Sequence, residues 1–151
     1  MAYIPKDAKW YLADIIEEFR VAGERDNLIH KNTVLVRADS PEEAYDRAIE
    51  LGKAGEISYE NSDGKLVTCT FRGLQNLQVI YEELEHGAEL MYEQWVGLSE
   101  EEVARLVRTK QRLNVFLPMS PAAGPNIAAR DIVEEAMTLL NARQEAGNDP
   151  A

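Results

Sequence analysis

The chain has 151 residues, and its formal net charge is −11. Apolar residues make up 45% of it and charged residues 28%, which is typical of a folded domain with a core and argues against a disordered chain. We expect no nucleic acid and no anionic membrane as a partner, because both attract clustered Lys and Arg. The acidic balance favours a basic protein instead, because opposite charges steer two proteins together.

Cysteine content and hydropathy indicate in which compartment the protein is expected to lie. Cys69 is the only cysteine, which excludes an internal disulfide and a zinc site of several cysteines and is typical of a reducing compartment. The N-terminal residues lack the basic start and unbroken apolar run of a signal peptide. No window approaches the roughly eighteen apolar residues that a membrane-spanning helix needs. We therefore expect a cytoplasmic protein.

Alternating apolar residues near the start of the chain predict two strands. Residues 9–21 form the first, and its shared apolar face, interrupted by Glu17, consists of Tyr11, Ala13, Ile15, Phe19 and Val21. Residues 29–38 alternate in the same way and form the second. The polar turn at residues 23–27 is short, so an antiparallel hairpin is the simplest pairing of the two strands.

A helix is predicted to follow the second strand. Ser40 is a suitable N-cap, Pro41 suits the first helical position, and Glu43 can complete a capping box. Ala44 and Ala48 then recur at helical spacing, which predicts a small-residue stripe packed on the sheet. Gly52 is a natural helix stop.

The stretch from Lys65 to Leu98 predicts two long strands joined by an acidic turn. A turn at residues 61–64 folds a short strand at 57–59 back on the first long strand, in which Gly73 marks a bulge or a bend. The acidic connection is Glu82 to Gly87, and the final strand is Ala88 to Leu98. That strand places Leu90, Tyr92, Val96 and Leu98 on one face and Met91 and Trp95 on the other.

These elements predict an α+β fold with an antiparallel sheet of about five strands, one helix packed on it, and C-terminal helices. A capping box at Ser99 begins a short helix, and a last helix runs from about residue 127 to 143. We expect a core domain at residues 1–98 and a helical extension at 99–151, with a linker near residues 120–126. The C-terminal helices should cover the second face of the sheet or reach a second subunit.

Several sequence blocks resemble one family. They are Lys9-Trp10-Tyr11-Leu12-Ala13, Thr33-Val34-Leu35-Val36-Arg37-Ala38 with Ser40-Pro41-Glu42-Glu43-Ala44, Tyr59-Glu60-Asn61 with Gly64, Phe71-Arg72-Gly73-Leu74, and Gly87-Ala88-Glu89-Leu90-Met91-Tyr92. Over about residues 9–98 the chain resembles an uncharacterised bacterial family known as domain of unknown function four-two-eight-eight. The resemblance implies a small α+β domain with no established activity. The residues after Leu98 look like an extension beyond that domain.

Residues with catalytic chemistry are few. His30 and His86 are the only histidines, and neither lies in an HxH or HExxH pattern. A metal-dependent enzyme would need both to meet carboxylates such as Glu85 or Glu89 in space. Cys69 has the strand phase of a buried structural cysteine, and no glycine-rich phosphate loop is present. We therefore predict no catalytic residue, no metal ligand and no cofactor.

Three functions remain open from the sequence. The favoured one is a non-catalytic acidic module that binds a basic protein, as an immunity or antitoxin protein would. Its expected binding residues are Glu82, Glu83, Glu85, Glu89, Met91, Glu93 and Trp95. The second is a structural or regulatory homodimer of unknown ligand, with the helix from Ile127 as an exchanged arm. The third is a metal-dependent enzyme that uses His30, His86 and carboxylates.

Overall fold

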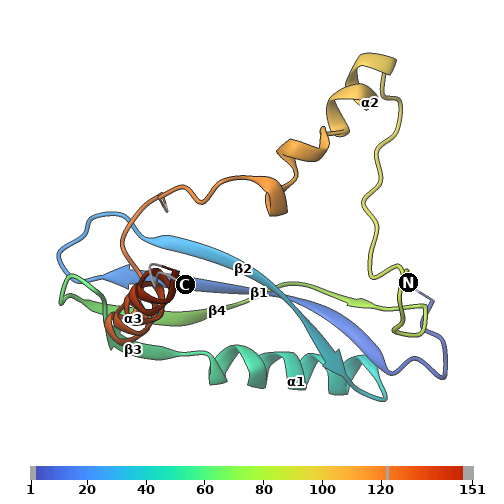
Figure 1. The fold of residues 1–151 in the computed structure, drawn as a ribbon. Helices are drawn as coiled ribbons and strands as arrows, with labels where there is room; N and C mark the ends of the chain where they lie inside the picture. Colours follow the sequence, from blue (N-terminus) through green and yellow to red (C-terminus); the bar gives the residue numbers. More distant parts are fainter. Residues whose placement is uncertain (1–2, 122, 148–151) are drawn as a thin grey trace.

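One antiparallel sheet organises the chain (Figure 1). The structure is a computed structural model that describes residues 3–121 and 123–147. The sheet has four strands in the order β2-β1-β4-β3, namely β1 (Trp10–Val21), β2 (Leu28–Arg37), β3 (Ile57–Glu60) and β4 (Leu66–Val79). The helix α1 (Pro41–Ala54) packs on one face, so the predicted α+β class is confirmed.

The central strand β1 pairs with β2 on one side and with β4 on the other. The β1–β2 register runs without a shift from Trp10 opposite Arg37 to Phe19 opposite Leu28. The β1–β4 register shifts twice, and Gly73 lies at one of the shifts with a φ of 138°. An extra residue and a positive φ are the marks of a β-bulge, so the bulge predicted at Gly73 is confirmed.

The helix α1 begins as predicted after the N-cap Ser40, but the capping box is not completed at the Ser40 N–H, and the end of the helix also differs. The Ser40 hydroxyl accepts a hydrogen bond from the Glu43 N–H, and the Glu43 carboxylate accepts one from the Asp39 N–H. The helix continues past Gly52 and ends at Gly55. Gly52 is a packing residue, because a Cβ there would lie 2.4 Å from Cε2 of the Phe71 ring.

The core occupies the face that α1 covers and is divided into two clusters. The first lies under α1 and consists of Tyr11, Ala13, Ile15, Val36, Ala38, Ala44, Ala48 and Val79. The second lies towards the other end of β1 and consists of Phe19, Val21, Val67 and Cys69. Leu28, Tyr59 and Ile127 pack against this second cluster. Residues 123–129, which we call the anchor segment, therefore pack on the core at one end of the sheet, as α1 packs on it at the other.

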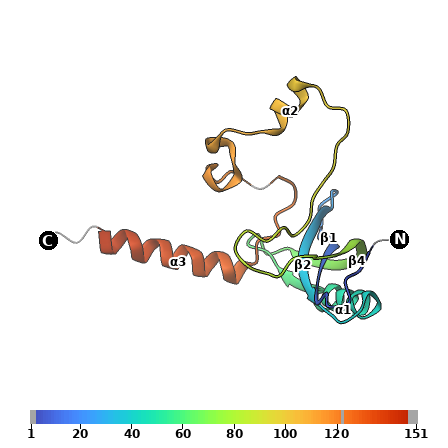
Figure 2. The ribbon, with the colours of Figure 1, turned by 90° about the vertical axis from the view of Figure 1, so that its right-hand side faces the viewer.

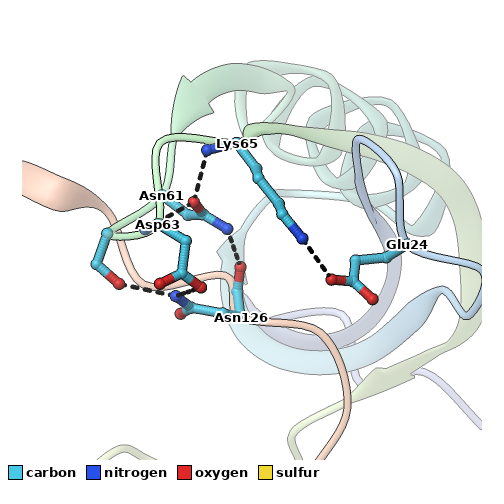
Figure 3. A network of polar contacts seen from close by, with 6 residues as sticks. Glu24, Asn61, Asp63, Lys65 and Asn126 are labelled. Carbon is cyan, nitrogen blue, oxygen red and sulfur yellow. Dashed lines mark hydrogen bonds and ion pairs between the residues drawn. The ribbon is translucent and has the colours of Figure 1, made fainter.

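A buried asparagine holds the anchor segment in place (Figure 3). Asn61 is 0% exposed, and its Nδ2 donates to the Asn126 carbonyl at 2.9 Å. Its Oδ1 accepts from the N–H groups of Asp63 and Lys65 at 3.0 and 2.8 Å. The predicted turn between β3 and β4 is thus confirmed, and one side chain joins it to the anchor segment.

The C-terminal anchoring is reinforced by further bonds. The Asn126 side chain donates to Ser62 Oγ at 2.7 Å and to Asp63 Oδ2 at 3.1 Å. The Ser62 N–H donates to the Ala128 carbonyl at 3.0 Å, and the Tyr59 hydroxyl donates to the Ile127 carbonyl. Because these residues are used for anchoring, the last helix, α3 (Arg130–Gly147), begins later than expected. Ile127 packs against the second core cluster of its own chain.

The predicted fifth strand at residues 88–98 is wrong, since the described residues form four strands. A hairpin onto β4 would need a free β4 edge. One side of β4 is taken by β1, and part of the other by β3. Further along that side, the Phe71 N–H donates to the Glu56 carboxylate and the Leu77 N–H to the Asn76 side chain. Residues 88–98 therefore find no free strand edge on β4 with which to pair.

Residues 81–121, which we call the arm, leave the end of β4 and arch away from the sheet (Figures 1 and 2). The arm contains α2 (Glu100–Leu106) and the 3-10 turns η1 (Lys110–Arg112) and η2 (Asn114–Phe116). Its predicted capping box is confirmed, with Ser99 and Glu102 bonded reciprocally. Neither α2 nor α3 has a buried residue, so the expectation that the C-terminal helices cover the second face of the sheet is wrong.

We predict that Asn61→Asp loosens the anchor segment and leaves the turn formed. The carboxylate still accepts from Asp63 and Lys65, but it cannot donate to the Asn126 carbonyl and faces that oxygen with a charge. The expected loss is about 1–3 kcal/mol in the free energy of unfolding. Urea denaturation gives the loss, and hydrogen exchange of residues 124–129 locates it. Asn141→Asp on exposed α3 is the control, and an equal loss in both variants would contradict the role of Asn61.

We predict that Gly52→Ala destabilises the fold, because the new methyl group overlaps the Phe71 ring. The expected net loss is about 1–3 kcal/mol after the better helix propensity of Ala is included. Gly55→Ala is the matched control. Gly55 has a φ of −80°, and its Cβ would meet the end of the Glu17 side chain at 2.9 Å and no aromatic ring. Thermal unfolding of both variants tests the comparison, and a neutral Gly52→Ala would contradict close packing at this crossing.

Candidate functional site

The arm displays large apolar side chains that no core covers. Every arm residue other than Ala88 is exposed. These apolar residues are Tyr81, Leu84, Leu90, Met91, Tyr92, Trp95, Val96, Leu98, Val103, Leu106, Val107, Leu113, Val115, Phe116, Leu117 and Met119. Single exposed apolar residues are ordinary, but a series of this length on one segment is typical of a surface that contacts another protein.

The acidic residues predicted to bind a partner form the base of the arm. The Glu82 carboxylate accepts from the Glu89 N–H at 2.6 Å, and the Ala88 N–H donates to the Glu85 carbonyl at 3.0 Å. Gly87 has a φ of 87° between them. These bonds fold residues 82–89 into a compact acidic turn. The turn was expected as a connection, and the structure adds that Glu82 shapes it.

The predicted binding residues do not converge on one point. Glu82 and Glu83 line a hollow at the end of the sheet that also contains Lys9, Trp10 and Arg37. The Arg37 guanidinium lies over the Trp10 ring, 5.7 Å from its centre.

Further along the arm, Met91 and Glu93 line a second hollow, which lies on the uncovered face of the sheet beside Lys31 and Thr33. Trp95 follows and is 55% exposed. The seven residues therefore form a strip along the base of the arm, and their binding role remains a prediction.

The carboxylates of this strip form no ion pair within the described residues, and only that of Glu82 takes part in shaping the turn. Within the described part of the chain, none of the seven salt bridges involves Glu82, Glu83, Glu85, Glu89 or Glu93. Residues 82–98 contain five glutamates and no Lys or Arg. Residues 82–98 of the arm therefore present apolar and negatively charged groups together, which suits a surface with apolar and positively charged groups.

The two histidines and the cysteine lie in different parts of the fold. His30 is on β2 and packs against the Phe19 ring, with the ring centres 4.9 Å apart, whereas His86 lies in the acidic turn. Residues 3–121 and 123–147 contain no group of three His, Cys, Asp or Glu arranged to hold a metal ion. Cys69 is buried in the second core cluster, and burial followed by the nearby Glu17 charge raises the pKa of its thiol.

Sequence reasoning missed the outer edge of β2. The strand lies at one side of the sheet, so half of its backbone groups face away from β1. A groove of about 500 Å³ follows this edge between β2 and α1, and its lining includes Leu35, Arg37, Arg47 and Leu51. The mix of apolar and basic residues in β2 was visible in the sequence. Its position at an edge was not, because strand order depends on contacts far apart in the chain.

Comparison with protein-family models relates the chain to known sequences. The model described as Domain of unknown function (DUF4288) matches residues 10–92, more than half of the chain. The chain belongs to this family. The resemblance drawn from the sequence blocks is thereby confirmed, and the DUF4288 segment comprises the sheet, α1 and the arm as far as Tyr92. Searches of curated proteins and of solved structures gave no match.

No helix within the described residues of this DUF4288 protein is long and apolar enough to cross a membrane.

We predict that Cys69 makes the stability of this DUF4288 protein fall at alkaline pH. Its thiol has a raised pKa in the folded state, so the unfolded state releases the thiol proton at a lower pH. The stabilisation is complete below the unfolded pKa of about 8.5 and is lost as pH rises beyond it. Denaturation at stepped pH should show a steeper alkaline decline for the wild type than for Cys69→Ala. Parallel declines would contradict the assignment.

Proposed function

We propose that this chain is a non-catalytic protein-binding module and that the arm, residues 81–121, is its binding element. The observation that carries the proposal is the exposed apolar series of the arm, which has no cover within the described part of the chain. Covering such side chains with a partner is favourable by about 25 cal/mol for each Å² of apolar surface removed from water. Aromatic anchors such as Tyr92 and Trp95 are the side chains that most often dominate a binding interface.

The charge of the arm supports a basic partner. Five glutamates accompany the apolar residues between positions 82 and 98, and no ion pair within the described residues neutralises them. Such a strip accelerates encounter with a positive surface and disfavours a negative one. A module of this kind acts by covering a surface of its target, as an immunity or antitoxin protein does. No chemical step is needed for that mode of action.

A structural or regulatory homodimer is the second candidate, and two observations favour it. The edge strand β2 has a side that pairs with no other strand in the described part of the chain. The helix α3 projects from the body and exposes Ile132, Met137, Leu139 and Leu140 (Figure 2). The third candidate, a metal-dependent enzyme, finds no ligand set among the described residues on which a mechanism could be built.

We predict that the double variant Met91→Ser/Trp95→Ser loses partner binding by at least about tenfold, because it removes apolar anchors of the arm. Wild type and variant are immobilised and exposed to native lysate at low salt. The captured protein is identified by mass spectrometry, and its affinity is then titrated. Added salt should weaken wild-type binding, because it screens the acidic strip.

Ile57→Ser provides the matched control for this experiment. Ile57 lies on β3, away from the arm, and is 56% exposed against 55% for Trp95. The control should bind as the wild type does. Equal capture by the arm variant and the wild type, or no protein above background at low salt, would contradict the proposed function.

A further inference from the structure

We infer that the surface bound by the arm is the β2 edge of a second copy of this chain. Residues 88–98 of each copy add as a strand to β2 of the other, which gives a two-fold dimer. The inference rests on the proposed function, because it takes the arm as the binding element. It develops the homodimer, the second candidate above, and adds the receiving strand and the kind of bonding.

The backbone of β2 is ready to receive a strand. The Ala38 N–H donates to the Lys9 carbonyl at 2.9 Å, which fixes which residues of β2 face β1. In an antiparallel ladder the bonded pairs alternate, so the other residues point their N–H and carbonyl groups outwards. These residues are Ile29, Lys31, Thr33, Leu35 and Arg37. The carbonyl of Arg37 accepts from Arg47 at 2.7 Å. Within the described residues no hydrogen bond uses the outward backbone groups of the other four.

The other free stretches of the sheet are poorer acceptors. The exposed side of β4 is distorted by two register shifts, and two of its N–H groups already donate to Glu56 and Asn76. The edge strand β3 has only four residues. By contrast, β2 has ten residues and pairs with β1 without a shift. A regular, unblocked edge of this length is the kind of surface that binds an added strand.

The arm contains a segment that needs such an edge. Residues 88–98 alternate like a strand and include the strand-favouring residues Tyr92, Trp95 and Val96, with no proline. In a single copy they belong to no strand. The open β2 edge and the unpaired segment are separate observations. The edge has backbone groups without a partner strand, and the segment is strand-like without an edge to pair with.

Side chains of the two segments are complementary in charge and polarity. The strand β2 carries Lys31 and Arg37 and no acidic residue, whereas residues 88–98 carry Glu89 and Glu93 and no Lys or Arg. Beside the edge, the groove between β2 and α1 exposes Leu35 and Leu51, and both Arg47 and Glu50 line it. A strand added to β2 would place alternate apolar side chains over this groove.

The path of the arm favours a second copy over its own β2. Met91, Tyr92 and Glu93 cross the uncovered face of the sheet beside Lys31 and Thr33, and the arm then continues away to α2 (Figure 2). The segment thus leaves its own body and does not follow the edge. Each copy offers one segment and one edge, so a reciprocal exchange fills both edges and closes the assembly.

Leu35→Pro is the variant that tests this inference. The substitution removes an N–H that points away from β1. It leaves the hydrogen bonds between β1 and β2 intact, because Leu35 and Leu12 form a non-hydrogen-bonded pair of the ladder. Leu35→Ala is the matched control, since it shortens the same side chain and keeps the N–H. Light scattering with gel filtration measures the mass of the full chain across dilutions, and circular dichroism checks that each variant is folded.

The expected result is a wild-type dimer, at least about a tenfold weaker dimer for Leu35→Pro, and a smaller loss for Leu35→Ala. A synthetic peptide of residues 86–99, in excess, should dissociate the wild-type dimer, whereas a scrambled peptide should not. The peptide test holds even if Leu35→Pro does not fold.

Several results would overturn the inference. One is a wild-type monomer at every dilution, and another is a dimer that neither Leu35→Pro nor the peptide weakens. A dimer lost instead in Leu140→Lys would assign the contact to α3. If the chain is monomeric but Met91→Ser/Trp95→Ser still loses a captured basic protein, the proposed function stands without this inference. If that variant changes neither assembly nor capture, both are overturned.

Discussion

The hydrogen bonds of Asn61 determine how the second half of the chain is arranged. The side chain is fully buried and bonds to its own turn and to the Asn126 carbonyl, so none of its polar atoms is left without a partner. The anchor segment is thereby held at one end of the sheet, while the Ile80 N–H bonds to the Trp10 carbonyl at the other. The arm is thus fixed at both ends and is presented as a long loop, which lowers the entropy it loses when it binds a partner.

The regular elements between residues 10 and 79 were largely predictable, because their signals are local. Alternation identified β1 and β2, Ser40 identified the start of α1, and Gly73 identified the bulge. The prediction of a helix stop at Gly52 was wrong, because this glycine allows close packing against Phe71, a residue distant in sequence. The strand pattern of residues 88–98 also misled, because a strand needs a free edge and the edge of β4 beside it is taken.

The candidate site was also predictable only where its signals are local in the sequence. Composition identified the acidic and apolar strip from Glu82 to Trp95, and the structure places that strip along the base of the exposed arm. It could not identify the β2 edge, which exists only because the strand order is β2-β1-β4-β3. Nor could it identify the groove of Leu35, Arg47 and Leu51, which requires α1 to lie beside that edge. The family match, which ends at Tyr92, contains both the edge and the start of the arm.

Hydrogen exchange of residues 88–98 at increasing protein concentration tests directly whether these residues pair with β2 of a second copy, because such a strand is protected only when copies meet. The account predicts fast exchange in dilute protein and slow exchange in concentrated protein, with the outward amides of Ile29, Lys31, Thr33 and Leu35 slowing over the same range. Slow exchange at every concentration would show that the segment pairs within its own chain. Fast exchange at every concentration would show that it pairs with no copy, and either result would contradict the account.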